Sequence, residues 1–197
     1  MSTVAPVQGG VQPAPGEWTY EDYLNLPDDG RRYEIIDGTL YVTEPRSVRH
    51  QLVLGEILGE IHQFLRTHKL GHMLIAPFEI HLSERTRPVQ PDLFYIKLER
   101  CPKSNVPFFE GAPDLIVEIL SPDTAKVDRF IKPKAYAEAG VTEYWIANPN
   151  ARTVEVFSLS EGEYVSLGEF KDDEVIRSVV LEGLAIVTST LFNPVYQ

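Results

Sequence analysis

Residues 113–120 read PDLIVEIL, and this run constrains the fold more than any other part of the chain. Successive side chains of a β-strand point to opposite faces, so Glu118 would share one face with Ile116 and Leu120. Both faces of the run are apolar, which is typical of a central strand covered on both sides. An ionised Glu118 in such a strand would be costly unless a partner compensates its charge. The run therefore predicts a covered central strand that carries a candidate functional carboxylate.

Length and composition favour one domain. The chain has 197 residues, of which 43% are hydrophobic and 24% charged, and these values are ordinary for a globular protein. Residues 1–16, MSTVAPVQGGVQPAPG, contain Pro and Gly throughout and have no apolar period, so we expect a disordered N-terminal tail there. We expect a single domain over residues 17–197.

Several classes of protein can be set aside. No apolar stretch approaches the ~20 residues of a membrane span and the N-terminus has no signal-peptide pattern, so we expect a cytoplasmic protein with no membrane partner. Cys101 is the only cysteine, which excludes an internal disulfide. The net charge of -11 argues against a protein that coats nucleic acid, because phosphate binding depends on Lys and Arg.

Local patterns predict the first elements. WTYEDYLNLPDDG predicts a short helix, and RRYEIIDGTLYV places an Asp-Gly pair between two β-prone runs, which predicts a hairpin with Glu34 on a strand. Residues 47–71 have the period of an amphipathic helix with Ser47 as its N-cap. His50 lies on the same apolar stripe as Leu54 and should point inward, where a hydrogen-bonded core histidine is the alternative to a functional one.

The remaining segments predict an α/β fold. Three β-like runs precede a helical segment at 121–140, which could cross over to a further, parallel strand, and small antiparallel strands with tight turns follow from residue 153. The β-like runs before residue 153 are 72–82, 89–98, 113–120 and 143–149. We therefore predict a mixed central sheet flanked by helices, with additional β-hairpins.

Two acidic residues suggest a metal site. Asp92 begins the apolar strand of QPDLFYI, and if this strand neighbours the one that carries Glu118, the two carboxylates converge. A divalent cation would relieve their repulsion, and hard oxygen ligands favour Mg²⁺ or Mn²⁺ over zinc. The alternative is that Asp92 caps a turn and Glu118 pairs with Lys or Arg.

A lysine could complete this site. Asp128, Lys132 and Tyr136 recur at spacing four, which puts them on one face of a helix, although Pro133 could kink that helix or occupy its first turn. An ammonium beside two metal-bound carboxylates could orient the attacking water, help it lose its proton and stabilise developing phosphate charge. The alternative is a lysine on the surface. The sequence has no phosphate-binding glycine loop, GxGxxG, GxSxG or HExxH motif.

With these residues located, the sequence resembles the Uma2 endonuclease family of the PD-(D/E)XK nuclease superfamily over roughly residues 17–160. The segments that carry the resemblance are LPDDGRRYEIIDGTLYV, RHQLVLGEI, VQPDLFYI, APDLIVEILSPDTAKVDRFIKPKAYAEAG and GVTEYWIANP. The resemblance implies a restriction-endonuclease-like fold in which Asp92 and Glu118 bind Mg²⁺. The metal would activate water for attack on a phosphodiester.

The resemblance also implies roles for other residues. The simple motif would place a lysine at position 120, which is Leu120 here, and Lys132 matches a position on the following helix to which the lysine has moved. Glu34 and His50 match recurrent family positions and could supply an outer-shell or second-metal contact. Asp114 shares a face with Glu118 and is an alternative ligand.

These patterns lead to one main hypothesis and three open points. We predict a Mg²⁺- or Mn²⁺-dependent endonuclease that cuts DNA, with Asp92, Glu118, Lys132, Glu34 and His50 in its catalytic site. A nuclease-like fold that serves only as a binding or assembly module is the alternative from a different class. RNA or a small phosphoester could replace DNA as the substrate, and the C-terminal hairpins could form a homodimer that cuts both strands.

Overall fold

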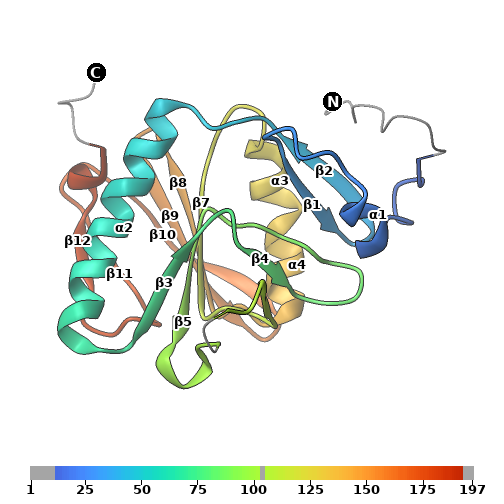
Figure 1. The fold of residues 1–197 in the computed structure, drawn as a ribbon. Coiled ribbons are helices and arrows are strands. Elements are labelled where there is room, and N and C mark those ends of the chain that lie inside the picture. Colours follow the sequence, from blue (N-terminus) through green and yellow to red (C-terminus); the bar gives the residue numbers. More distant parts are fainter. Residues whose placement is uncertain (1–11, 103–104, 193–197) are drawn as a thin grey trace.

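The computed structural model describes residues 12–102 and 105–192. A six-stranded mixed sheet dominates it, and its strands are β3 (Gly71–Ile75), β5 (Leu93–Lys97), β7 (Leu115–Ile119), β8 (Glu143–Asn148), β9 (Thr153–Ser160) and β10 (Glu163–Lys171). Their order across the sheet is β10-β9-β8-β7-β5-β3 (Figure 1). Strand β7 pairs with β5 in antiparallel and with β8 in parallel, so it occupies the interior of the sheet as predicted.

Helices cover both faces of this sheet (Figure 1). Helix α2 (Val48–His68) covers one face, and α3 (Ala125–Phe130) with α4 (Lys132–Ala139) covers the other. Residues 115, 117 and 119 of β7 are buried in the core that includes α2, whereas Ile116 and Leu120 are buried in the core that includes Tyr136 of α4. The alternation predicted for this strand is therefore confirmed, and Glu118 lies on the α4 face.

Helix α2 begins where the sequence indicates. The Ser47 side chain accepts a hydrogen bond from the His50 backbone N–H, and Lys69 ends the helix in a left-handed conformation. The buried stripe comprises His50, Val53, Ile57, Ile61 and Leu65. This stripe contains Val53 in place of Leu54, which is only partly buried, and it carries the inward-facing histidine at its N-terminal end.

The predicted helical segment at 121–140 forms two helices. Ile131 separates them, and Pro133 lies in the first turn of α4, where its missing N–H leaves no helical hydrogen bond unmade. Gly140 then ends α4 with a φ of 91°, a conformation that glycine adopts without strain. The spacing-four face of Asp128, Lys132 and Tyr136 survives this break.

Smaller elements surround the sheet. Helix α1 (Tyr20–Leu24) precedes the predicted hairpin of β1 (Arg32–Ile36) and β2 (Thr39–Thr43), which turns at Asp37-Gly38. The run predicted as one strand at 72–82 instead splits, because its second part leaves the sheet and pairs elsewhere. The further elements are β4 (Glu79–His81), β6 (Phe108–Glu110), β11 (Val175–Arg177), β12 (Ala185–Val187) and the 3-10 helices η1 (Leu98–Arg100) and η2 (Thr188–Phe192).

The structure confirms the predicted fold class, an α/β mixed sheet flanked by helices with additional hairpins. Of the tail predicted at residues 1–16, residues 1–11 lie outside the described residues. Across 12–102 and 105–192, no helix combines the length and the apolar character needed to cross a membrane.

Candidate active site of buried carboxylates

Lys132 lies among three carboxylates that come from three different elements. Its Nζ is 2.9 Å from Glu118 Oε1 of β7, 3.1 Å from Glu34 Oε2 of β1 and 3.2 Å from Asp128 Oδ1 of α3. Tyr136, one turn further along α4, donates a hydrogen bond of 2.7 Å to the same Glu118 oxygen. All five side chains are buried. The sheet, the first hairpin and the paired helices thus meet at one polar cluster inside the protein.

Asp92 lies beside this cluster. Leu93 of β5 pairs with Val117 of β7, and extending that register by one residue sets Asp92 opposite Glu118. The Asp92 carboxylate accepts a hydrogen bond of 2.9 Å from the Ile119 backbone N–H, so its side chain continues the pairing of the two strands. The two acids therefore come from adjoining strands, which is the condition that the predicted metal site required.

Basic side chains surround Asp92. Oδ1 accepts a hydrogen bond of 2.9 Å from Arg32 Nη1, and Oδ2 lies 3.0 Å from His50 Nε2 of α2. Arg46 is further away, with Nη2 at 3.8 Å from Oδ1. Asp92 thus has an arginine of its own, whereas Glu118 is compensated by a shared lysine.

These surroundings shift the pKa values of Asp92 and Glu118 in opposite directions. Burial raises the pKa of Glu118 to about 8, because the attraction of Lys132 offsets only part of the loss of water. Burial raises the pKa of Asp128 as well. Burial alone would also raise the pKa of Asp92, but the hydrogen bond from His50 and the charge of Arg32 outweigh it and hold that pKa below its ordinary value.

The lysine keeps its proton. Burial by itself would lower the pKa of Lys132, but the neighbouring carboxylates, Glu118 first among them, raise it above its ordinary value. The raised pKa favours the charged form of Lys132 near neutral pH.

The structure brings together all five residues that the sequence singled out, which are Glu34, His50, Asp92, Glu118 and Lys132. It separates Asp114, the alternative ligand, which instead accepts a hydrogen bond from the Lys97 backbone and pairs with Arg100. The site also contains Arg32 and Arg46, which were not predicted there from the sequence and whose side chains are 17% and 5% exposed. For Arg32 a signal existed, because it lies two residues before Glu34 and shares its strand face.

The donor set fits a divalent cation that keeps some of its water. Glu118 Oε2 is buried and has no hydrogen-bond partner among the described residues, so a lone pair on it is available. Asp92 Oδ1 accepts one short hydrogen bond and has capacity for another contact. Within the described part of the chain no three His, Cys, Asp or Glu side chains are arranged to hold a metal by themselves. Mg²⁺ is commonly held by one or two carboxylates together with water and substrate phosphate.

Comparison with known protein families identifies the family of this chain. A model of the Uma2 family, described as "Putative restriction endonuclease", matches residues 20–189. The chain belongs to the Uma2 family.

The fold of this Uma2 chain is shared with solved structures. One of them is described as a "putative nuclease belonging to DUF820" from Anabaena variabilis, and the two chains are 20% identical with a TM-score of 0.75. The match covers 88% of the Uma2 chain and 97% of the other chain. A search of curated protein sequences found no match.

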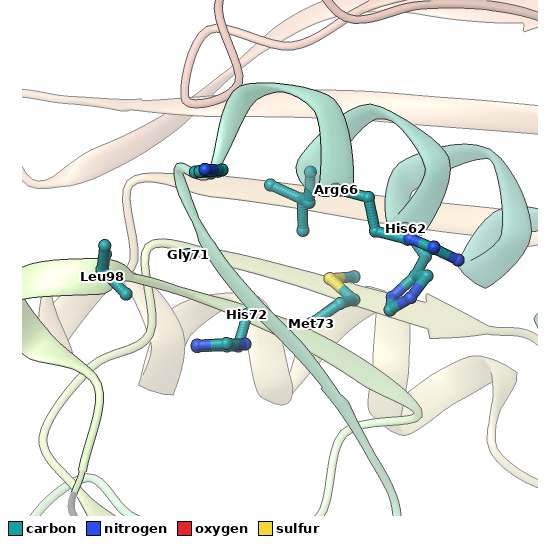
Figure 2. Close-up of a pocket in the computed structure, with 8 residues that line it drawn as sticks. His62, Arg66, Gly71, His72, Met73 and Leu98 are labelled. Carbon is teal, nitrogen blue, oxygen red and sulfur yellow. The ribbon is translucent and has the colours of Figure 1, made fainter.

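Two pockets lie near different parts of the Uma2 fold. Figure 2 shows the first, between the C-terminal half of α2 and β3, where His62 and Arg66 lie over Met73. This pocket of about 430 Å³ is bordered by none of the buried carboxylates. A second pocket of about 250 Å³ is lined by Arg32 and Arg46, the two arginines that lie within 4 Å of the Asp92 carboxylate.

Proposed function

We propose that this Uma2 protein is a metal-dependent endonuclease that hydrolyses DNA phosphodiester bonds. The observation that carries the proposal is the pair of buried acids on adjoining strands, Asp92 and Glu118, with a charged lysine beside Glu118. The family description and the fold shared with a protein described as a nuclease support the same activity. A bound Mg²⁺ would lower the pKa of a coordinated water and so supply the nucleophile.

Asp92 and Glu118 would hold the metal through the oxygens that have capacity left. Asp92 is ionised and is oriented by Arg32, His50 and the Ile119 N–H, so its position is fixed before a cation arrives. Glu118 has a raised pKa and would release its proton when the cation binds. The site would thus consist of one preformed ligand and one that ionises on binding.

Lys132 would act as a fixed positive charge. Because its pKa is raised, it would stabilise negative charge that develops on the phosphate rather than remove a proton. Glu34 and Asp128 hold the ammonium from two sides, and Tyr136 fixes the Glu118 carboxylate that it contacts. These three would be positioning residues.

Cleavage assays with matched variants test the proposal. Purified protein would be incubated with supercoiled plasmid, single-stranded DNA, branched DNA or RNA, with Mg²⁺, with Mn²⁺ or with a chelator. Asp92→Asn, Glu118→Gln and Lys132→Met should each lower metal-dependent cutting of DNA by about 100-fold or more. Asp114→Asn is the matched control, because Asp114 is a buried acid next to β7 that lies outside the cluster. Folded wild-type protein that cuts no DNA with either metal would contradict the proposal, and cutting of RNA alone would reassign the substrate.

A second candidate is a binding or assembly module that keeps the nuclease fold. The observation in its favour is the pairing of Asp92 with both Arg32 and His50, which already balances its charge without a metal. Calorimetry distinguishes the two functions, because a nuclease should bind Mn²⁺ through Glu118 whereas a module need not bind it.

A homodimer remains a prediction of the same proposal, since two sites on one dimer would suit cutting of both DNA strands. Light scattering coupled to gel filtration measures the mass in solution. A monomer at all concentrations would remove the dimer and leave nicking of single strands as the expected activity.

A further inference from the structure

The Arg46 side chain is buried, yet only one of its three nitrogens has a hydrogen-bond partner among the described residues. It is 5% exposed, and Nη1 donates to Ser121 Oγ at 3.1 Å. Nε and Nη2 are also buried and find no acceptor in the part of the chain that the structure describes. A buried guanidinium with two unsatisfied nitrogens is costly, and such a group calls for a partner.

The need to neutralise a carboxylate does not explain why the Arg46 side chain is buried here. Asp92 is the nearest carboxylate, but Arg46 Nη2 is 3.8 Å from it, beyond hydrogen-bond distance. Arg32 already donates to the same oxygen at 2.9 Å, and His50 contacts the other oxygen. As a counter-ion for Asp92, Arg46 would therefore be redundant.

A contact near the end of β7, the strand that carries Glu118, fixes the position of Arg46. Ser121, which it contacts, follows β7, and the Ser121 hydroxyl is in turn 3.0 Å from Thr124 Oγ1 at the start of α3. The guanidinium is thus attached to the same end of β7 as Glu118. Its free Nε and Nη2 form one planar edge, the geometry that binds two oxygens of a phosphate at once.

An opening for such a ligand exists beside this arginine. Three arginines, Arg31, Arg32 and Arg46, line the pocket of about 250 Å³, and Glu44 is its one acidic lining residue, so the charged groups of its wall are mainly positive. The buried acids behind it would repel an approaching phosphate, and a positive wall offsets that repulsion.

We propose that Arg46 binds a phosphate group of the nucleic-acid substrate through Nε and Nη2, at the pocket next to Asp92. The inference rests on the proposed nuclease function and adds the residue that would seat the substrate. It predicts a bipartite site, in which carboxylates face the cation and Arg46 faces the phosphodiester.

Binding without metal tests this inference separately from cleavage. Wild type, Arg46→Gln, Arg46→Lys and Arg66→Gln would be titrated with a dithymidine phosphodiester and with its uncharged methylphosphonate analogue, in the presence of a chelator. The Nε–Hε resonance of Arg46, assigned by its loss in Arg46→Gln, reports contact at that edge. Arg66→Gln is the control for loss of one positive charge, because Arg66 lies on the pocket in Figure 2 at the other end of α2.

The expected result is a shift of the Arg46 resonance with the phosphodiester and none with the methylphosphonate. Arg46→Gln should weaken binding by roughly tenfold or more, and Arg46→Lys should weaken it less, while Arg66→Gln stays within about twofold of wild type. An unmoved Arg46 resonance, or equal binding by wild type and a folded Arg46→Gln protein, would overturn the inference. A protein that binds the phosphodiester through Arg46 but cuts no nucleic acid would support this inference and contradict the nuclease function. Cutting that is unaffected by Arg46→Gln would support the nuclease function and contradict this inference.

Discussion

Lys132 contacts Glu118 from a different secondary-structure element, with Nζ 2.9 Å from Oε1 across 14 residues of chain. Strand β7 supplies the carboxylate and helix α4 supplies the ammonium, so their contact depends on how α4 packs against the sheet.

Removal of the lysine charge should destabilise the protein strongly. Lys132→Met leaves Glu118, Glu34 and Asp128 without their shared cation, and we expect a loss of about 3 to 5 kcal/mol in the free energy of unfolding. Urea denaturation measures this loss. Lys134→Met is the matched control, because Lys134 is 78% exposed and should change stability by less than about 0.5 kcal/mol.

A double variant tests the cause of that loss. Adding Glu118→Gln to Lys132→Met removes one of the uncompensated acids, so the two effects should not add and the double variant should be more stable than their sum predicts. Additive effects would show that the lysine stabilises the protein through packing alone.

Stability of the metal-free protein should fall as the pH rises toward 8. The folded-state pKa of Glu118 is raised from 4.5 to about 8, so its protonated form stabilises the fold fully at low pH, and this contribution is lost between the two values. The slope attributable to this group is at most about 1.4 kcal/mol per pH unit. Denaturation of wild type and Glu118→Gln at several pH values separates its contribution, and parallel curves would contradict it.

The affinity for Mn²⁺ should rise with pH as Glu118 loses its proton. Binding of Mn²⁺ requires the ionised Glu118, so affinity should rise about tenfold per pH unit from pH 6 to about 8 and then level off. Calorimetry in buffers of different ionisation enthalpy would detect the released proton. Asp114→Asn should keep the wild-type profile, and a pH-independent affinity would mean that Glu118 is not the ligand that ionises.

Tyr136 should tune this titration. Its hydroxyl donates to Glu118 Oε1 at 2.7 Å, so Tyr136→Phe should raise the pKa of Glu118 further and lower stability by about 1 to 2 kcal/mol. Tyr164→Phe is the control, because the Tyr164 hydroxyl donates to the Val141 carbonyl instead of a carboxylate. The pH at which stability declines should move upward only in the Tyr136 variant.

Local patterns were sufficient for much of the fold. The alternation around Glu118, the Asp-Gly turn at 37–38 and the Ser47 cap each depend on residues close together in sequence, and all three are observed. The convergence of Asp92 with Glu118 was predictable only on the condition that their two apolar strands are neighbours, and the structure supplies that pairing.

The remaining features depend on contacts between distant segments. The split of residues 72–82 into β3 and β4 is set by pairing with β5 and β6, which no local pattern reports. Arg46 is buried because Ser121 and Asp92, 75 and 46 positions away in sequence, lie beside it in space. A charged residue in a polar stretch gives no sign of such burial, so Arg46 could not be located beforehand.

The break at Ile131 bears on how relatives of this chain can vary in length. The lysine approaches Glu118 from docked helices, so the loop at residues 121–124 can gain or lose a residue while that approach is kept. An insertion between Asp128 and Tyr136 would instead turn the lysine by about 100° around the helix axis, away from the acids. Insertions and deletions should therefore be tolerated in the loop before α3 and selected against within α3 and α4.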